Sequence, residues 1–405
     1  MQKQHFVFLN QYYPPDMAPT GVMLRDVAEE MVAQGNRVTI ICSRGGYSGG
    51  ENELPIPGGS DEIRVIRVPT FRFGRNSALG KLCDYASFYF LAFWFGLTAK
   101  GGPTCYVALT TPPYLSVLVR LVSKLRRAKH AHWVMDLYPD VMVAHGLLKE
   151  NSWTTTCLLA ISRWGFGGSR NHKTVSLGPD MADRLLRRHG VENGVWIPLW
   201  SSAVTDDSAE ENSHLLRKER GWDGKTVFLY SGNMGLGHRL EDFLTLAKEN
   251  QDDRKLVFAF YGGGRRKKEV EDFLKENPGS RVEVGDYVPE ELLAAHLLSA
   301  DVHLASLEPS WDGCMVPSKI QGIFASARPV FFVGSESCAI GRWIREANAG
   351  WIVAPGDHGL LISDFREALD EGIRGQKGQS ALKFSEERFN AHRNLNQVVE
   401  EVSCE

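Results

Sequence analysis

Short apolar runs alternate with longer amphipathic stretches through the first half of the chain. Runs of strand length lie at residues 5–10, 36–43, 63–69, 106–110, 131–137, 173–178 and 194–199. Between them, periodic apolar positions predict helices over 21–34, 82–99 and 114–129, and another after Trp153. This alternation predicts a parallel sheet covered by helices on both faces.

The alternation stops after Trp200 and then starts again. Residues 201–222 are polar and acidic, which predicts a linker, and apolar runs resume at 226–232. We therefore expect an α/β protein of two Rossmann-like, doubly wound domains that face each other across a cleft. The N-terminal domain would span 1–200 and the C-terminal domain 201–384, with a final helix over 385–405 packing back on the first. Ligands of such sheets bind beyond the carboxyl ends of the strands.

Composition narrows the class of protein and of partner. The chain has 405 residues and a formal net charge of −3, which gives no reason to expect nucleic acid as a partner. Its seven cysteines are scattered without a CxxC pair, which predicts reduced thiols in a cytoplasm. The N-terminus leaves no room for a signal peptide before the first apolar run. The apolar stretch 86–99 is shorter than the roughly 20 residues that a bilayer span needs.

Two turns predict a site for a diphosphate. Residues 314–319 place Pro317 and Lys319 after an acidic, tight loop, where the N–H groups of a helix beginning at the proline and one lysine could converge on an anion. A second turn at 232–237 lies between an apolar run and an amphipathic helix, but its glycine spacing departs from the dinucleotide fingerprint. The turns therefore predict binding of a nucleotide diphosphate other than NAD.

The order of several motifs along almost the whole chain resembles one enzyme family. They read NQYYPPDMAPTG at 10–21, MDLYPD at 135–140, SGNMG at 231–235, and VPSK at 316–319 followed by ARPV. This order resembles the family 4 retaining glycosyltransferases of the GT-B fold, in the bacterial branch that builds exopolysaccharide and surface polysaccharide. The resemblance implies transfer of a hexose from a UDP-sugar, with UDP-glucose as first choice, and no separate cofactor. The acceptor would be a glycan or a polyprenyl-diphosphate-linked saccharide.

The resemblance also implies residues that contact the donor diphosphate. Gly21 would let the backbone approach the donor, and Asn233 stands where many relatives place a phosphate-binding arginine. His238 and Arg239 lie where the family has a lysine. Arg239 would neutralise the leaving diphosphate through charge-assisted bonds, or else be paired with the acidic residues at 241 and 242. Lys319 would be the second cation.

Other donor contacts implied by the resemblance come from backbone and base-reading loops. Tyr287 and Val288 follow a strand whose loop reads uracil in relatives, although Tyr287 could equally be a core aromatic. Backbone atoms of the segment before Lys319 would add contacts from Met315, Val316, Pro317 and Ser318.

Two carboxylates common in the family are absent. Cys314 and Gly322 occupy the positions of paired glutamates, the second of which grips the ribose in relatives. Glu308 or Asp312 could supply a carboxylate to the sugar instead. The absence also favours an alternative, a catalytically reduced GT-B protein that binds a nucleotide as a scaffold. A UDP-N-acetylhexosamine epimerase of the same fold ranks last, because its catalytic set cannot be located.

Asp136 is the third expected catalytic residue, with Arg239 and Lys319. It ends an apolar run beside Tyr138, Pro139 and Asp140, where a polar role near the sugar or acceptor competes with capping of the next helix. No metal is expected, since there is no Asp-x-Asp triplet and since His130 and His132 are interpreted as lying on opposite faces of a strand.

A membrane contact is the last expectation. The aromatic stretch 86–99 could be core, or it could contact the anionic inner face of the plasma membrane together with basic residues on a nearby helix. These basic residues are Arg120, Lys124, Arg126, Arg127 and Lys129. The protein would then be cytoplasmic and peripheral at that face.

Overall fold

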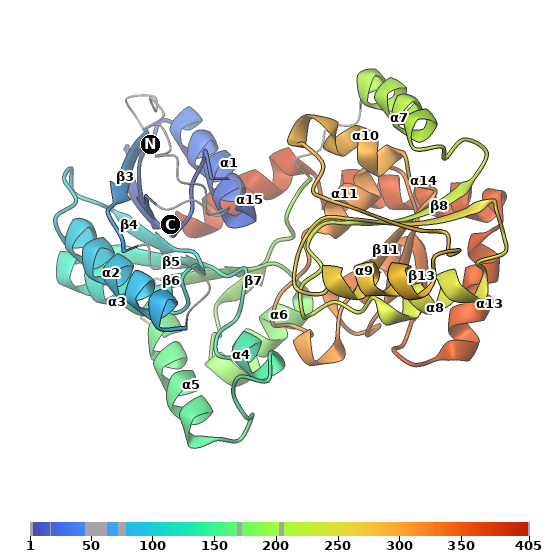
Figure 1. Cartoon of the computed structure of the whole chain (residues 1–405). Coiled ribbons are helices and arrows are strands. Elements are labelled where there is room, and N and C mark those ends of the chain that lie inside the picture. Colours follow the sequence, from blue (N-terminus) through green and yellow to red (C-terminus); the bar gives the residue numbers. More distant parts are fainter. Residues whose placement is uncertain are drawn as a thin grey trace. The chain divides into compact units, whose positions relative to one another are not determined.

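Apolar runs rich in β-branched and aromatic residues form the strands of two parallel sheets, each covered by helices (Figure 1). The computed structural model describes residues 3–16, 18–44, 63–71, 78–167, 172–201 and 206–403. One unit consists of Met1–Ile197 and His392–Glu405, and the other of Pro198–Ala391. The predicted α/β fold with two doubly wound sheets is confirmed.

The N-terminal unit contains a seven-stranded sheet in the order β3-β2-β1-β4-β5-β6-β7. Its strands are β1 (His5–Leu9), β2 (Arg37–Ser43), β3 (Ile63–Val68), β4 (Cys105–Ala108), β5 (Lys129–Trp133), β6 (His172–Ser176) and β7 (Gly194–Trp196). All neighbours are parallel; Phe6 of β1, for example, lies opposite Val38 of β2 and Cys105 of β4.

Helices cover both faces of this sheet. They are α1 (Pro19–Ala33), α2 (Ala78–Leu97), α3 (Leu115–Arg126), α4 (Asp140–Ala144), α5 (Trp153–Phe166), α6 (Pro179–Arg184) with a π-helical turn Leu185–His189, and α15 (Ala391–Val402). Val7 and Leu9 of β1 pack with Phe88 of α2 and Val119 of α3, which sets α2 and α3 on one face. The other face carries α1 (Figure 1).

The C-terminal unit contains a six-stranded parallel sheet in the order β10-β9-β8-β11-β12-β13. Its strands are β8 (Thr226–Ser231), β9 (Leu256–Tyr261), β10 (Val282–Gly285), β11 (Val302–Ser306), β12 (Val330–Val333) and β13 (Gly350–Val353). Its helices are α7 (Asp207–Glu219), α8 (Glu241–Glu249), α9 (Lys267–Glu276), α10 (Leu293–Leu298), α11 (Lys319–Ala325), α12 (Ala339–Ala347), α13 (His358–Ala368) and α14 (Glu371–Arg388), with 3-10 turns at Glu290–Leu292 and Pro309–Trp311.

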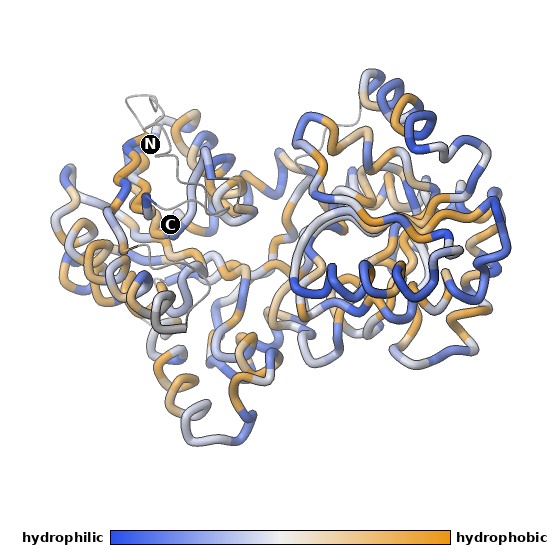
Figure 2. The backbone as a smooth tube through the Cα atoms, viewed as in Figure 1, coloured by the Kyte–Doolittle hydropathy of each residue, from blue (hydrophilic) through white to orange (hydrophobic). Residues whose placement is uncertain are grey.

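Both faces of the second sheet are buried, as continuous apolar strands predict. Phe228 and Tyr230 of β8 enter one core cluster, whereas Val227 and Leu229 enter another. The tube in Figure 2 is accordingly apolar along the central strands and mostly polar along α9.

Two sequence expectations differ from the structure. The polar stretch 201–222 contains α7, where a linker was predicted; the Asp206 side chain accepts a hydrogen bond from Ala209 N at 2.8 Å and caps the helix. A single final helix over 385–405 was also wrong, because α14 ends at Arg388 and α15 begins at Ala391. α7 buries only Ala209 and Ser213, so the apolar pattern did not mark it, and no glycine or proline marks the break between α14 and α15.

Candidate functional site

The C-terminal unit has a switch point at which a ligand site is expected. β8 and β11 are neighbours, but the chain continues from β8 to β9 and from β11 to β12, on opposite sides. Diverging connections leave a crevice beyond the carboxyl ends of two parallel strands. The loops there are 232–240 and 307–318, and Glu308 N donates to Gly237 O at 2.8 Å across them. Trp311 packs on Gly237 so closely that a Cβ there would lie 2.8 Å from its ring.

Lys319 points back from the start of α11 over the end of β8. Its Nζ lies 3.6 Å from the ring centroid of Tyr230, a cation–π contact. The Nζ atom is buried and has no hydrogen-bond partner within the described part of the chain. Desolvation lowers the pKa of Lys319 to about 7. A buried amine without a counterion is a group that an anionic ligand would restore to full charge. The helix itself begins at Lys319, two residues later than the predicted start at Pro317.

His238 also lies beside the ring of Tyr230. Its ring is perpendicular to that of Tyr230 at 6.1 Å, and its Nδ1 donates to Ser306 O at 2.6 Å. Burial, followed by the charge of Lys319, lowers the pKa of His238 to about 3. The imidazole is therefore neutral at physiological pH, and the bond from Nδ1 leaves Nε2 as an acceptor. The sequence left both His238 and Arg239 as candidates for this position, and His238 is the one near Lys319.

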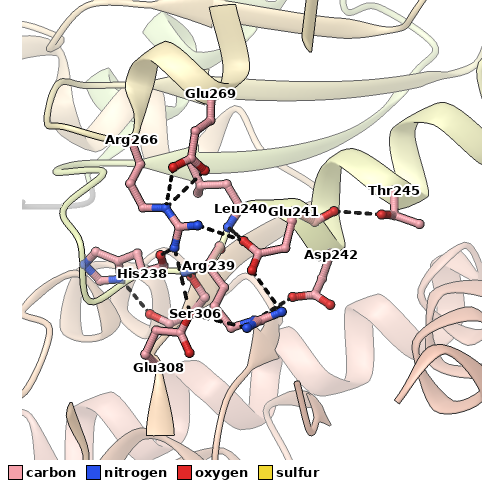
Figure 3. Close-up of polar contacts among 10 residues, drawn as sticks. All are labelled: His238, Arg239, Leu240, Glu241, Asp242, Thr245, Arg266, Glu269, Ser306 and Glu308. Carbon is pink, nitrogen blue, oxygen red and sulfur yellow. Dashed lines mark hydrogen bonds and ion pairs between the residues drawn. The ribbon is translucent and has the colours of Figure 1, made fainter. Parts of the chain in front are cut away.

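Arg239 instead belongs to a network of ion pairs (Figure 3). Its guanidinium lies 2.9 Å from Glu241, 2.9 Å from Asp242 and 3.3 Å from Glu308. Arg266 joins the same network through Glu241 at 3.2 Å. This is the pairing that the alternative interpretation of Arg239 expected. To bind a diphosphate, Arg239 would have to exchange a carboxylate for a phosphate.

Close backbone packing fixes the loop that contains Asn233. Gly262 has φ +139°, and a Cβ there would lie 2.0 Å from Gly232 O. Gly264 has φ +118° and lies against Asn233, whose Oδ1 would be 2.5 Å from an added Cβ. Tyr230 donates its hydroxyl proton to Asn233 O at 2.9 Å. The loops after β8 and β9 therefore hold each other at the same edge of the sheet, with Asn233 exposed.

Tyr287 and Val288 follow β10 at that edge. Tyr287 is exposed, so the alternative that it is a core aromatic is wrong. Its ring rests against Gly263, where an added Cβ would lie 2.8 Å away. Val288 is half-buried. An exposed ring held against a glycine loop is able to stack on a planar ligand.

The segment before Lys319 offers backbone atoms and no carboxylate at the two family positions. Val316 and Pro317 are buried, Met315 is half-buried and Ser318 is exposed. Cys314 is buried, with its Sγ 3.8 Å from Ser310 O. A Cβ on Gly322 would lie 3.0 Å from Leu297 Cδ1, so a glutamate there would require Leu297 to shift.

In the N-terminal unit, Gly21 occupies the first turns of α1. A Cβ on Gly21 would lie 3.1 Å from Tyr12 O, so glycine lets the helix approach the loop after β1. Asn10, at the end of β1, is fully buried and donates to Tyr12 O at 2.7 Å. β1 and β4 form the switch point of this sheet, and Gly21 therefore lies beside it.

Asp136 lines a pocket beyond β5, together with Thr110, Tyr114, His132 and Tyr138 among others. Desolvation raises the pKa of Asp136 to about 6. Asp136 does not cap α4, whose N-cap residue is Pro139 and which has no side-chain cap. The capping alternative is therefore wrong.

A second carboxylate in this region is that of Asp140, which is buried. Its carboxylate oxygens lie 2.8 Å from a guanidinium nitrogen of Arg184 and 2.8 Å from Nε2 of His189. Burial alone would raise the pKa of Asp140, but the hydrogen bond from His189 and the nearby positive charges lower it below its ordinary value. Asp140 is thus a buried structural anion, whereas Asp136 faces the pocket.

The sequence interpretation of the histidine pair was wrong. Residues i and i+2 share one face of a strand, and the rings of His130 and His132 lie 5.4 Å apart, with His172 5.6 Å from His130. Within the described ranges, no group of three or more histidine, cysteine, aspartate or glutamate side chains could hold a metal ion. Sequence reasoning also missed Tyr230 as the platform for Lys319, because a strand-end aromatic gives no signal of its own.

Comparison with known proteins shows which family and which relatives this chain resembles. Residues 20–200 match the family described as glycosyl transferase 4-like domain. The Escherichia coli protein WcaI, whose name describes a glycosyl transferase of colanic acid biosynthesis, is 24% identical over 96% of this chain and 97% of its own. The Pseudomonas aeruginosa protein WbjE, named as a glycosyltransferase, is 28% identical over 71% of this chain and 72% of its own. Residues 20–200 therefore belong to the glycosyl transferase 4-like family, and the two sheets together have the GT-B fold.

Solved glycosyltransferase structures agree with this chain in fold. WaaG, a glycosyltransferase involved in lipopolysaccharide biosynthesis, superimposes with a TM-score of 0.70 at 14% identity over 98% of this chain and 99% of its own. HepE from Anabaena, solved in complex with UDP, gives a TM-score of 0.68 at 14% identity over 99% of this chain and 100% of its own. A further HepE structure contains UDP-glucose.

Proposed function

We propose that this glycosyltransferase moves a hexose from a UDP-sugar, with UDP-glucose as the first candidate, onto a growing surface polysaccharide or exopolysaccharide. The transfer would retain the anomeric configuration. The acceptor would be a glycan or a polyprenyl-diphosphate-linked saccharide, so the enzyme would work at the inner face of the plasma membrane. The observation that carries the proposal is the buried, unpartnered Nζ of Lys319 at the switch point of the C-terminal sheet.

The charge of a diphosphate fits that amine. Lys319 has lost solvation without gaining a counterion, and its pKa is lowered to about 7. A phosphate oxygen near Nζ would stabilise the ammonium form and be bound by it. His238 is neutral and would accept a hydrogen bond from the donor without adding charge. Backbone N–H groups of loop 232–240 would add donors to the phosphates.

Chemistry would consist mainly of charge stabilisation and placement. Lys319, together with Arg239 once it has left a carboxylate, would stabilise the departing UDP without a metal ion. Tyr287 and Val288 would hold the uracil. Asp136, whose pKa is raised to about 6, would form a polar contact with the sugar or the acceptor hydroxyl. The complexes of HepE with UDP and with UDP-glucose support this donor class.

Calorimetric titration tests the donor. Wild-type protein would be titrated with UDP, GDP, UDP-glucose and UDP-N-acetylglucosamine, with and without magnesium. We expect metal-independent binding of UDP and UDP-glucose and weaker binding of GDP. Tighter binding of GDP than of UDP, or binding only with magnesium, would contradict the proposal.

A nucleotide-binding scaffold is a second candidate, because Cys314 and Gly322 replace the paired carboxylates of the family and Leu297 fills the space beside Gly322. The two candidates differ in turnover. Incubation of UDP-glucose with the protein and a membrane extract should give free UDP and a glucosylated lipid product. Tight binding of UDP-glucose without either product would favour the scaffold.

A further inference from the structure

Helix α5 carries a stripe of large apolar side chains that are exposed in the described part of the chain. Trp153, Ile161 and Trp164 are exposed, and Cys157 between them is exposed as well. Their spacing of four, four and three residues places all of them on one side of the helix. Two exposed tryptophans on one stripe are unusual for a surface that contacts water alone.

Large apolar side chains are also exposed on the two neighbouring helices, α3 and α2. α5 packs closely on α3, where a Cβ on Gly165 would lie 2.6 Å from Ser116 Oγ, and α3 packs on α2 near Gly96 and Val122. Each of these helices exposes an i, i+4 pair of large apolar residues. We call the whole set the apolar face: Phe90, Trp94, Leu121, Leu125, Trp153, Ile161 and Trp164. Exposure ranges from 40% for Leu121 to 75% for Trp153, and Figure 2 shows the apolar colouring along α3 and α5.

The charged side chains of α3 and α5 are all basic, and α2 contains one aspartate, Asp84. Helices α3 and α5 contain no aspartate or glutamate, although the chain as a whole has a net charge of −3. Their basic residues are Arg120, Lys124, Arg126 and Arg163, and Arg127 follows α3 directly. The Arg120 guanidinium lies 4.7 Å from the centroid of the Trp164 ring, which joins the basic and aromatic groups across α3 and α5.

Aromatic and aliphatic side chains interleaved with lysine and arginine fit the boundary between lipid headgroups and acyl chains. Anionic headgroups attract each nearby lysine or arginine, and tryptophan rings favour that depth. Among the described residues, no helix is long and apolar enough to cross a membrane. These properties describe a surface that lies on a bilayer.

We propose that the apolar face docks on a bilayer rich in anionic phospholipid, with the stripe of α5 inserted among the headgroups. The inference deepens the proposed function and rests on it for its purpose, because a polyprenyl-diphosphate-linked acceptor is presented at that same surface. Charge complementarity selects a lipid surface over a second copy of the chain, whose matching face would be equally basic.

Flotation of the full-length protein with vesicles tests the docking. Vesicles of phosphatidylcholine alone would be compared with vesicles that also contain phosphatidylglycerol. We expect co-flotation with the anionic vesicles only, and loss of binding at high salt because the attraction is screened. The double variant Trp94→Ser, Trp153→Ser should bind the anionic vesicles at least about tenfold more weakly than wild type. The matched control Leu215→Ser removes a 52% exposed leucine from the C-terminal unit and should bind as wild type.

Charge reversal tests the contribution of the basic residues beside the apolar face. Lys124→Glu with Arg127→Glu should lower the vesicle partition coefficient by about tenfold or more. The matched control, Lys218→Glu with Arg254→Glu, reverses two exposed charges in the C-terminal unit and should leave binding unchanged.

The outcomes separate this inference from the donor proposal. UDP affinity of every variant is measured in vesicle-free solution, where the apolar face plays no part. Retained UDP binding with no flotation of the wild type overturns the docking inference alone. Equal flotation of the tryptophan variant and its control would also overturn it, as would a dimer in sedimentation that the same variant abolishes.

Discussion

Two buried ionisable side chains dominate at the scale of single residues. Lys319 in the C-terminal unit and Asp136 in the N-terminal unit are both shifted toward their neutral forms by desolvation. Perturbed groups at the carboxyl ends of parallel strands are typical of functional sites. Each pKa shift also predicts a pH dependence that can be measured: of donor affinity for Lys319 and of fold stability for Asp136.

Affinity for UDP-glucose should fall as the pH rises above 7. Lys319 has a pKa of about 7 in the free protein, and the donor phosphates would favour its protonated form. Below pH 7 the charge is already present, whereas above it binding must take up a proton, which weakens affinity by up to about tenfold per pH unit. Titrations at pH 6.5 and 8.5 check this. The Lys319→Met variant should show no such slope, and an identical slope in both proteins would contradict the assignment.

Asp136→Asn should stabilise the fold at high pH. The raised pKa means that the folded state holds its proton more tightly than the unfolded chain, so stability is present below about pH 4 and is lost as the pH rises through about 6. Replacing the carboxyl by an amide removes a cost of up to about 3 kcal/mol at pH 8. Urea unfolding at pH 4 and pH 8 measures it. A variant that is less stable than wild type at pH 8 would show that the carboxylate has a partner.

At the scale of elements, the sequence predicted the strands well and the loop geometry poorly. The central strands are buried on both faces, so their apolar runs mark them directly, as in residues 226–231 of β8. The ion pair between Arg239 and Glu308 could not be predicted, because Glu308 lies on another loop, 69 residues away in sequence. Nor could Tyr230 be assigned, since its role depends on where Lys319 returns to the sheet.

The loops after β8 and β9 should tolerate no side chain at Gly262. With φ +139° and Gly232 O within 2.0 Å of an added Cβ, Gly262→Ala should lower the free energy of unfolding by about 2 kcal/mol or more. Weakened UDP binding should accompany it. Gly279→Ala is the matched control, because nothing lies within 4 Å of its added Cβ. Equal stabilities of the two variants would contradict the packing described.

At the scale of the whole molecule, the end of the chain returns to the beginning. α15 belongs with the N-terminal unit, where Val398, Val399 and Val402 are buried. Cys105 of β4 lies beneath it, with its Sγ 3.4 Å from Val402 O. The sequence suggested this return through the amphipathic pattern of the tail but placed its start too early.

Truncation after Asn390 should therefore expose a thiol far away in sequence. We expect Cys105 to react with an alkylating reagent in the truncated chain and to be protected in the full chain, as read by mass spectrometry of peptides. Cys338, buried in the C-terminal unit, should stay protected in both. Continued protection of Cys105 after truncation would show that α15 does not cover it.

The central claim is that Lys319 binds the diphosphate of the donor. The most direct measurement is the dissociation constant for UDP, by calorimetry at pH 7, of wild type, Lys319→Ala and the control Lys275→Ala, which removes an exposed lysine of α9. A charge-assisted hydrogen bond is worth about 1.5–3 kcal/mol, so Lys319→Ala should weaken binding by about tenfold or more while the control binds as wild type. Unchanged UDP affinity in a folded Lys319→Ala protein would contradict the claim.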